Sequence, residues 1–370
     1  MQSSARTAWR RMLALNVAVM TLLFVYKVTL TIPAAQYTQH LADYHFGFIR
    51  RALVGAIVGL VFPVLPLWAP YVLGGLVWLA TLLLFLKLFD RTFGFKDENL
   101  PLLVFTAGSP FFLKNFIQTL GYFDIYGCLL AIGLLLVPAR SRWYVIAAGA
   151  GSIVLIAIHH IHMLMYVPTI IVIVALRHHL NRALSVADFV LASAFLAGLG
   201  LAFLAAQFWG AAPVSLQEFD AYLRSRMAHP DIKLTSYMYY RTLAEEIADT
   251  WIVMPANALR FPIYAALIAL HLPLISYFNR TIRGLREPVH QQLVYTAIVL
   301  VGLGYLIMLG VVFDYARFIS DWATCMILIL FAVKALPARE VPAFAGDDQT
   351  AQRLGWIVSI IPRVGTTKPF

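Results

Sequence analysis

Long apolar stretches without charge recur along most of the 370 residues, and they restrict the possible fold more than any other feature. Hydrophobic residues make up 61% of the chain and charged residues only 12%, which is outside the range of soluble domains. Backbone groups in hydrocarbon must be hydrogen-bonded within the protein, and the apolar runs are continuous rather than alternating, so helices are expected instead of barrel strands. The sequence therefore predicts an all-α, polytopic transmembrane helical bundle.

About ten segments approach the roughly 20 apolar residues that a membrane-spanning helix needs, although several of them are shorter. They are 12–33, 71–89, 100–113, 124–137, 143–158, 164–176, 188–209, 255–278, 292–313 and 318–333. Alternate loops between them are basic, and Lys and Arg concentrate on the cytoplasmic side of membrane proteins. These basic positions include Arg6, Arg10, Arg11, Arg91, Lys96, Arg140, Arg142, Arg177, Arg182, Arg280, Arg283 and Arg286. Both termini are therefore predicted to be cytoplasmic.

The apolar segment 52–66 decides whether this topology holds, because counting it as a span would move every later basic loop outside. Its prolines Pro63 and Pro66 and its glycines Gly55 and Gly59 suit a segment that enters the bilayer, bends and leaves. We predict a re-entrant or interfacial helix in the first outer loop. The alternative is that the segment spans and the charge bias misleads.

The expected organisation is a transmembrane helical domain over 1–336 followed by a cytoplasmic C-terminal tail over 337–370. The domain carries two long outer loops, 34–70 and 210–254. In the second loop, 215–227 and 236–251 show spacing compatible with helices. Tyr237 and Tyr240 in this loop suit either the membrane interface or a surface on which a sugar ring stacks.

The charge of +10 and the cysteine count exclude two classes of function. Most of the positive surplus lies in the short loops that anchor helices, so it does not indicate nucleic-acid binding. The two cysteines, Cys128 and Cys325, fall inside predicted spans, so neither a disulfide framework nor a thiolate metal site is expected.

The first outer loop contains a carboxylate followed by a pair of guanidinium groups. Asp43 precedes Arg50 and Arg51, and outward-facing arginines run against the usual charge bias. A carboxylate takes a proton from a hydroxyl, and arginine grips a phosphate bidentately, so we predict a base at Asp43 and a phosphate site at the arginines. The alternative is that Asp43 caps a helix and the arginines reach lipid headgroups.

Further ionisable residues fall at the same predicted side of the membrane. They are Asp124, His159, His160, His162, Asp314 and Arg317. Arg317 is a third candidate for the phosphate, and Asp124, His159, His162 and Asp314 are predicted to complete the pocket. Two imidazoles with a carboxylate also suit a divalent metal such as Mg²⁺ or Mn²⁺, although a histidine pair at a membrane boundary is more often a hydrogen-bonding feature.

Sequence features typical of several common transporter and hydrolase classes are absent. The centres of the predicted spans are almost free of ionisable residues, which argues against a path across the membrane. A phosphate-cradling glycine loop, a His-Glu-x-x-His motif and a Gly-x-Ser-x-Gly motif are all absent from the sequence. Nucleotide-driven transport and the usual hydrolase mechanisms therefore lack their characteristic residues.

This arrangement resembles the GT-C superfamily of integral membrane glycosyltransferases. The resemblance rests on a first helix, an outer loop with an acidic residue and membrane-lying helices, and further acidic, His and Arg residues at the outer mouth of the bundle. It implies a donor sugar linked to polyprenyl phosphate and a catalytic carboxylate in the first outer loop, a position that Asp43 occupies. The frequent adjacent acidic pair is absent, because Tyr44 follows Asp43. The Phe-Gly-Phe-Ile-Arg-Arg stretch also resembles bacterial membrane proteins associated with surface polysaccharides.

The resemblance predicts glycosyl transfer on the outer face of a bacterial cell inner membrane, in surface polysaccharide or glycolipid synthesis. The expected partners are the lipid bilayer, a polyprenyl-phosphate-linked sugar donor and a saccharide or lipid-linked acceptor. A polysaccharide polymerase or ligase that uses lipid-linked oligosaccharide is one alternative. A flippase or other transporter of lipid-linked sugar is another, and a non-catalytic assembly partner is a third.

Overall fold

The computed structural model describes residues 3–180, 185–340, 342–346 and 348–364. Every regular element within these ranges is a helix, and the only β-type pairing described there consists of two isolated bridges, Leu65 with Met227 and Leu285 with Ala338. The all-α prediction is therefore confirmed for the described part of the chain.

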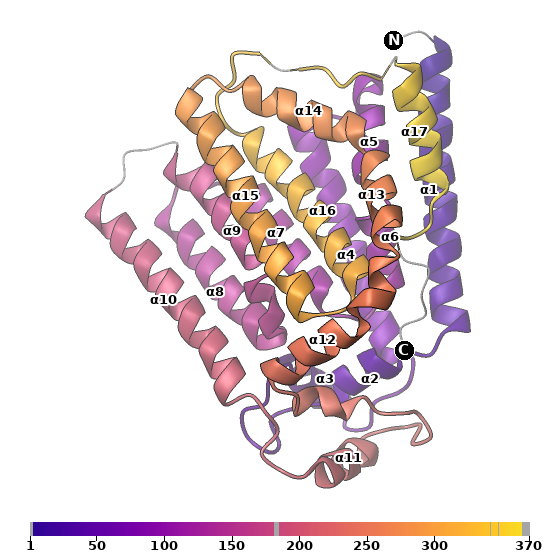
Figure 1. The fold of residues 1–370 in the computed structure, drawn as a ribbon, viewed down its shortest axis with the longest axis vertical. Helices are drawn as coiled ribbons and strands as arrows, with labels where there is room; N and C mark the ends of the chain where they lie inside the picture. Colours follow the sequence, from indigo (N-terminus) through magenta and orange to yellow (C-terminus); the bar gives the residue numbers. More distant parts are fainter. Residues whose placement is uncertain (1–2, 181–184, 341, 347, 365–370) are drawn as a thin grey trace.

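Most of the helices run side by side along one direction (Figure 1). The long ones are α1 (Ser3–Leu30), α4 (Ala69–Phe93), α10 (Val186–Phe208), α15 (Pro288–Val311) and α16 (Tyr315–Val333). Shorter helices and single turns lie between them, namely η1 (Asp97–Asn99), α5 (Leu100–Thr106), α6 (Leu113–Gln118), α7 (Asp124–Leu136), α8 (Arg142–Ile158), η2 (His160–Met163), α9 (Val167–Val174), η3 (Ala175–His179) and α13 (Phe261–Ala269). The remaining elements are α2 (Ala34–Leu41), α3 (Leu53–Val61), α11 (Leu216–Ser225), η4 (Ser236–Tyr239), α12 (Leu243–Ala258), α14 (Leu272–Arg283) and α17 (Gln349–Ile360).

Among the residues that the structure describes, six helical segments are long and apolar enough to cross a membrane. They are Ala5–Leu30, Ala69–Phe93, His160–His178, Val186–Phe208, Pro288–Val311 and Tyr315–Val333, and α12 with α13 adds a seventh if that bent pair is one span. Helices α7 and α8 are apolar but have only 13 and 17 residues. The chain is thus an integral membrane protein by length and composition of its helices, while the expected number of about ten spans is not confirmed.

Two of the predicted spans are broken in the structure. The segment 100–113 is divided between α5 and α6, and the segment 255–278 is divided among α12, α13 and α14. Helices α12 and α13 meet at an angle of 67°. Pro262 and Pro273 lie in the first turns of α13 and α14, where a missing N–H costs nothing, whereas inside a continuous helix each would remove a hydrogen bond. Apolar composition alone did not predict these interruptions.

The segment 52–66 forms the short helix α3, whose nine residues rise only about 13 Å. A bilayer core is about 30 Å thick, so α3 is too short to cross it. Helix α3 packs closely on α2, because a side chain at Gly55 would collide with the carbonyl oxygen of Ala42. Helices α2, α3 and α11 lie together at one end of the bundle (Figure 1).

The basic loops gather at the opposite end. Arg10 pairs with Asp97 at 2.9 Å, which joins the N-terminal helix to the loop before α5. Arg91 at the end of α4 donates to the carbonyl oxygen of Leu136 at 2.9 Å, and Arg142 pairs with Asp188 at 3.3 Å. Helix α14 lies at this end as well (Figure 1). The loops that the sequence marks as basic are therefore neighbours in space.

The described part of 337–370 packs on the bundle. Helix α17 runs along α1, and the Nζ atom of the buried Lys114 donates to the carbonyl oxygens of Val358 and Ser359 at 3.0 and 2.9 Å. The indole N–H of Trp9 donates to the carbonyl oxygen of Gly346 at 2.9 Å. The segment that the sequence separates as a tail is thus held by buried hydrogen bonds.

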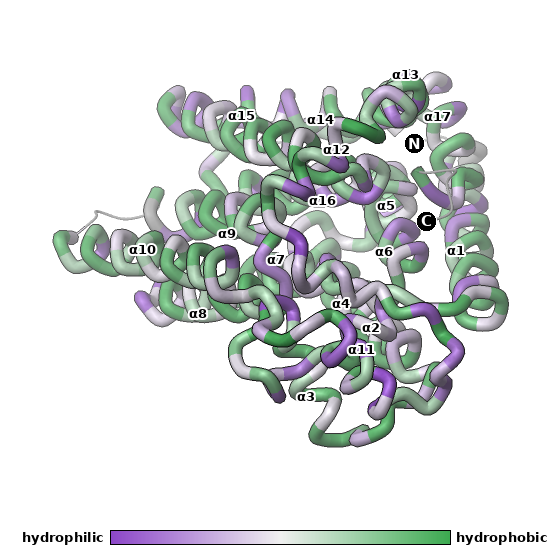
Figure 2. The backbone as a smooth tube through the Cα atoms, turned by 60° about the horizontal axis from the view of Figure 1, so that its bottom comes forward, coloured by the Kyte–Doolittle hydropathy of each residue, from purple (hydrophilic) through white to green (hydrophobic). Residues whose placement is uncertain are grey.

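Hydrophilic residues are concentrated on the loops around α11 and near the first turn of α7, whereas the bundle helices are mostly hydrophobic (Figure 2). Helix α10 presents Val186 and Phe189 with 82% and 74% of their surface exposed, as expected for a lipid-facing helix. Besides the basic loops at the opposite end, polar side chains gather at the end that carries α2, α3 and α11.

Candidate functional site

Two polar regions lie near this end, and each contains an aspartate paired with an arginine. The first, named here the buried cluster, consists of Arg51, Asp124, His159, Asp314, Arg317 and Asp321. The second, named here the interfacial groove, is lined by Asp43, Tyr44, His45, Ala56, Gly59, Leu60, Pro63 and Arg226. Seven of the ten predicted site residues belong to the buried cluster or lie against it, and Asp43 lies in the groove.

Arg317, in the first turn of α16, is the centre of the buried cluster. Its Nε atom lies 2.9 Å from Asp124 Oδ2, without the alignment of a hydrogen bond, and its Nη1 atom lies 3.4 Å from Asp314 Oδ2. The Tyr122 ring lies 5.3 Å from the guanidinium carbon. Asp124 is the first residue of α7, where the positive end of the helix favours a carboxylate. The structure thus joins three predicted residues through one buried guanidinium group.

Asp321 lies one turn beyond Arg317 on α16 and is completely buried inside a candidate span. Its Oδ1 atom accepts a hydrogen bond from the Tyr166 hydroxyl at 3.0 Å, while Oδ2 has no partner among the described residues. The sequence placed the ionisable residues at the outer mouth and left the interior of the spans almost empty. Asp321 is an exception to that expectation, since it is a carboxylate enclosed by protein within α16.

The histidines meet at the junction of α8 and η2. The Nδ1 atom of His159 accepts a hydrogen bond from the backbone N–H of Ile161 at 3.3 Å, and His162 Nε2 lies 3.2 Å from the carbonyl oxygen of Phe123. The rings of His159 and His162 are 6.1 Å apart between centroids. In the part of the chain that the structure describes, no three His, Cys, Asp or Glu side chains surround a position for a metal ion. This arrangement therefore does not fit a divalent-metal site.

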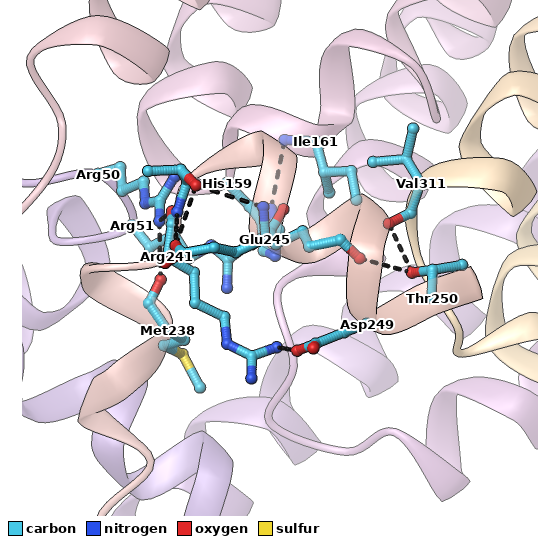
Figure 3. Close-up of polar contacts among 12 residues, drawn as sticks. Arg50, Arg51, His159, Ile161, Met238, Arg241, Glu245, Asp249, Thr250 and Val311 are labelled. Atoms are coloured by element: carbon cyan, nitrogen blue, oxygen red, sulfur yellow. Dashed lines mark hydrogen bonds and ion pairs between the residues drawn. The ribbon is translucent and has the colours of Figure 1, made fainter. Parts of the chain in front are cut away.

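Arg50 holds the long outer loop in place. Its backbone N–H donates to the carbonyl oxygen of Gly210 at 2.8 Å, and its Nη2 atom donates to the carbonyl oxygens of Met238, at 3.1 Å, and Arg241 (Figure 3). These contacts connect the start of the loop with its far end. The sequence analysis predicts that Arg50 and Arg51 both bind a phosphate. In the structure the Arg50 guanidinium group is already hydrogen-bonded to backbone oxygens of the outer loop, whereas that of Arg51 is not.

Arg51 points toward the buried cluster. Its φ angle of 64° is a left-handed conformation that costs a non-glycine residue about 1–2 kcal/mol and is found most often at functional sites. The side chain is 11% exposed, its Nη2 atom lies 3.9 Å from Glu246 Oε1, and its Nε atom has no partner among the described residues. Burial lowers the pKa of Arg51 to about 10 against the opposing effect of Glu246, so the group stays charged at neutral pH.

Arg51 also lies within electrostatic range of several cluster residues and of two buried groups beside them. It interacts with His159 and Asp124, and in Figure 3 it lies next to His159. Both Arg51 and Arg50 interact with Tyr239 and His160. The Tyr239 hydroxyl, His160 Nδ1 and the Nε atoms of both arginines are buried without a described partner. Burial raises the pKa of Tyr239, so its hydroxyl remains a hydrogen-bond donor. Unpaired buried donors of this kind favour an anion.

In the interfacial groove, Asp43 is held by three groups. Its Oδ1 atom accepts from the backbone N–H of His45 at 2.9 Å, and Oδ2 accepts from the Tyr222 hydroxyl at 2.7 Å and pairs with Arg226. Arg226 also donates to the carbonyl oxygen of Leu41 at 2.7 Å. The backbone of Arg226 is fixed in turn, because its carbonyl oxygen accepts from the N–H of Leu65 at 2.8 Å.

The groove lies against α3 and has a volume of about 410 Å³. A side chain at Gly59 would collide with Arg226 Nη2, so glycine at this position lets the guanidinium group lie on the helix. Leu60 forms part of the lining and is 85% exposed. Neither Arg50 nor Arg51 lines the groove. The sequence predicts that Asp43 and these two arginines share one pocket. In the structure Asp43 pairs with Arg226 instead.

The two predicted stacking residues lie in the second outer loop and line neither region. Tyr237 is 51% exposed and lies over the guanidinium group of Arg241 at 5.0 Å. Tyr240 packs on Phe219 with ring centroids 6.0 Å apart. Helices α11 and α12 broadly follow the predicted segments 215–227 and 236–251, although η4 and a break precede α12. Tyr222, not Tyr237 or Tyr240, is the tyrosine that contacts Asp43.

Sequence reasoning gave several residues of both regions no place beside Asp43 or the cluster, although it counted Tyr222 and Tyr239 among the aromatic residues of the second outer loop. Arg226 and Tyr222 complete the groove, and Glu246, Tyr166 and Tyr239 border the buried cluster. None of them belongs to a local motif, and Arg226 is 183 residues away from its partner Asp43. The sequence marks them only as polar residues in or beside apolar segments.

The comparisons with known proteins do not place the chain in a family. No family model, no curated protein and no solved structure matches the chain. The class that the structure itself defines is a helical integral membrane protein with a polar end.

Proposed function

We propose that the protein is a membrane glycosyltransferase that moves a sugar from a polyprenyl-phosphate-linked donor to an acceptor on the outer face of a bacterial inner membrane. The observation that carries the proposal is the pair of buried, unpaired donors at Arg51 Nε and the Tyr239 hydroxyl, near the Asp124 to Arg317 pair. Such a set suits the phosphate of the donor.

The proposed orientation follows from the two ends of the bundle. The end that carries the basic loops faces the cytoplasm by the charge bias of membrane proteins, and the end with α2, α3 and α11 then faces outward. In this arrangement the bent pair of α12 and α13 is one span, and α7, α8 and the broken pair of α5 and α6 cross the membrane with help from neighbouring helices; with the six long apolar segments this gives ten crossings, the number that the sequence predicts. Helix α3 lies in the outer interface.

Arg51 is the proposed phosphate ligand. Its only described ion pair, with Glu246, is loose at 3.9 Å, so an incoming phosphate competes for the guanidinium group. Arg317 is already shared between Asp124 and Asp314 and fixes Asp124 opposite Arg51. Transfer of an activated sugar needs mainly positioning and neutralisation of charge on the leaving phosphate, and preorganised buried donors supply both.

Asp43 is the proposed base toward the acceptor hydroxyl. Asp43 lines the groove, and its Oδ1 atom accepts one described hydrogen bond, from the His45 N–H, so this oxygen has a position left for an acceptor hydroxyl. The carboxylate takes the hydroxyl proton while the acceptor oxygen bonds to the anomeric carbon and the phosphate leaves, so direct transfer inverts that carbon. The interfacial position of α3 lets the lipid of a substrate stay in the membrane.

Reconstitution with a radiolabelled polyprenyl-phosphate sugar tests the proposal. Asp43→Asn is expected to lower the transfer rate by roughly 10²–10⁴-fold, the usual contribution of a general base. Arg51→Gln is expected to weaken donor binding by more than about tenfold. Asp231→Asn, at an exposed carboxylate of the second outer loop, is the matched control and is expected to keep full activity. Full activity of Asp43→Asn would remove the proposed base.

A transporter of lipid-linked sugar is the second candidate, and Asp321 is the observation that favours it. A buried ionisable residue inside a span often marks a substrate or proton path. A flippase moves the labelled lipid between leaflets without forming a new glycosidic bond, whereas the enzyme forms product with the lipid on one side. A polymerase or ligase uses the same substrates and is identified by a polymeric product.

A further inference from the structure

We infer that the interfacial groove binds the saccharide headgroup of a membrane-anchored glycolipid, with the lipid chain lying along α3. The inference deepens the proposed function, because it gives the acceptor a site and a chemical class. The groove combines polar side chains that can form further hydrogen bonds, one paired charge of each sign, aromatic rings and apolar residues of α3.

The polar groups of the groove are engaged but not saturated. An ionised carboxylate offers about four acceptor positions, and three groups occupy Asp43: the His45 N–H, the Tyr222 hydroxyl and Arg226. Arg226 carries five N–H donors, and its described acceptors are Asp43 and the carbonyl oxygen of Leu41. One acceptor position and several donors therefore remain at the groove, which is the mixture that sugar hydroxyls satisfy.

Charge decides between a sugar and a phosphate at this position. The groove has one carboxylate and one guanidinium group, and these are paired with each other. A phosphate placed here would meet the Asp43 carboxylate and would have to displace it from Arg226. A neutral polyhydroxyl group binds both without separating the pair. The buried cluster differs, because Arg51 has only one described ion pair there, with Glu246 at 3.9 Å, and its Nε atom has no described partner.

The ring of His45 lines one side of the groove, and Tyr222 and Phe46 pack against His45. His45 stacks on Tyr222 with ring centroids 4.4 Å apart and an angle of 11° between the planes, and Phe46 meets Tyr222 edge-on at 5.2 Å. Tyr44 also lines the groove. Rigid, amphipathic rings of this kind suit the apolar face of a sugar while its hydroxyls reach polar groups.

The opposite wall is apolar and faces the membrane. It consists of Ala56, Leu60 and Pro63, and Leu60 and Val61 of α3 are 85% and 69% exposed. A volume of about 410 Å³ is within the usual range of small-molecule sites, about 300–1,000 Å³, so it takes a headgroup but not a whole lipid. The lipid chain of the ligand therefore continues over the exposed face of α3.

Cysteine protection at Leu60 tests the inference without any transfer reaction. Both native cysteines are fully buried, so Leu60→Cys is expected to be the one reactive thiol, with Leu76→Cys on the lipid face of α4 as the matched control. Each variant is placed in phospholipid nanodiscs and labelled with a maleimide in the presence of dodecyl maltoside, dodecyl phosphate or dodecanol. Dodecyl maltoside is expected to slow labelling at Leu60→Cys by roughly tenfold and to leave Leu76→Cys unchanged.

Three results would overturn the inference: no protection, equal protection at Leu76→Cys, or protection by dodecyl phosphate as strong as that by dodecyl maltoside. Adding Arg226→Gln to the Leu60→Cys reporter is expected to remove most of the protection, and near-UV circular dichroism checks the fold of the double variant. Protection that persists in the double variant also contradicts the site. Because no donor is present, protection without transferase activity would reject the proposed function alone.

Discussion

The buried cluster and the interfacial groove each contain an aspartate paired with an arginine, but the two pairs differ in the burial of their carboxylates. In the groove the side chains of Arg226 and Asp43 are 11% and 19% exposed, and in the cluster those of Arg317 and Asp124 are 14% and 2% exposed. A pair that reaches water contributes little to stability, whereas a buried charge that loses its partner is very costly. The two arginines are similarly buried, so the difference between the pairs lies in how far each aspartate reaches water.

The surroundings of the two pairs reinforce this difference. Asp43 accepts hydrogen bonds from three groups and borders an open groove, while Asp321 beside Arg317 has an oxygen without a described partner in the interior of α16. The groove can therefore exchange ligands with the membrane surface. The cluster can only accept a ligand that replaces interactions within the protein.

The largest expected effect is the loss of the buried guanidinium group. Arg317→Met leaves Asp124 uncompensated in the cluster and is expected to lower the free energy of unfolding by about 3–5 kcal/mol. Arg226→Met in the groove is the matched control, with a smaller expected loss of about 1–2 kcal/mol, because Asp43 is 19% exposed and keeps hydrogen bonds from the His45 N–H and the Tyr222 hydroxyl. Thermal unfolding of both variants in detergent measures the difference. Equal losses would show that the two pairs do not differ in kind.

A pH-dependent loss of stability is expected from His40, which lies in α2 near the groove and is buried against Phe123. Burial lowers the pKa of His40 from 6.5 to about 4, so the unfolded chain takes up a proton before the folded protein does. Stability is therefore complete above about pH 7 and falls between pH 6.5 and 4, by about 2 kcal/mol at pH 5. Melting temperatures of His40→Gln and the wild type over this range measure the effect. Parallel pH profiles would contradict it.

Removing the charge of Asp321 is expected to have a smaller effect of the opposite sign. Asp321→Asn keeps an oxygen for the Tyr166 hydroxyl and removes a carboxylate from the interior, so stability is expected to stay equal or rise by about 1 kcal/mol. Asp124→Asn is expected to destabilise, because Arg317 loses its closest carboxylate. The same unfolding measurement compares the two. A strong destabilisation of Asp321→Asn would show that its charge supports the cluster.

The smallest effect on stability, with a clear effect on binding, is expected at Gly59. In Gly59→Ala the new methyl group displaces the Arg226 guanidinium group, whose flexible end can move at a cost below about 1 kcal/mol. Protection of the Leu60→Cys reporter by dodecyl maltoside is expected to fall severalfold while the melting temperature hardly changes. Gly200→Ala in α10, where the glycine has open space around it, is the control. Unchanged protection in Gly59→Ala would separate Arg226 from the site.

Part of the fold was predictable because the chain's own composition dictates it. Apolar stretches such as those of α4 and α15 satisfy their backbone only as helices in a bilayer, so the all-helical class followed from the sequence. The short length of α3 agrees with a segment that does not cross. The breaks at Pro262 and Pro273 and the resulting bend were missed, because hydropathy averages over the residues that end a helix.

The sequence predicted which types of residue the candidate site contains. It predicted only some of the pairs that these residues form with each other. Asp124, Asp314 and Arg317 are brought together at the predicted end of the bundle. Arg50 and Arg51 are neighbours in sequence, yet one binds backbone oxygens of the outer loop and the other faces the cluster. A left-handed residue at Arg51 sends the two side chains to different surroundings, and no local pattern shows such a turn.

The sequence by itself determined that this protein is helical, that it lies in a membrane and that its chemistry is concentrated among a few charged residues. These properties depend on hydrophobicity and charge, which every residue carries independently of its neighbours. The tertiary structure decided that Asp43 pairs with Arg226 and that Asp321 is enclosed within α16. Pairing and burial depend on which distant segments pack together, and the packing of helices is a property of the whole bundle.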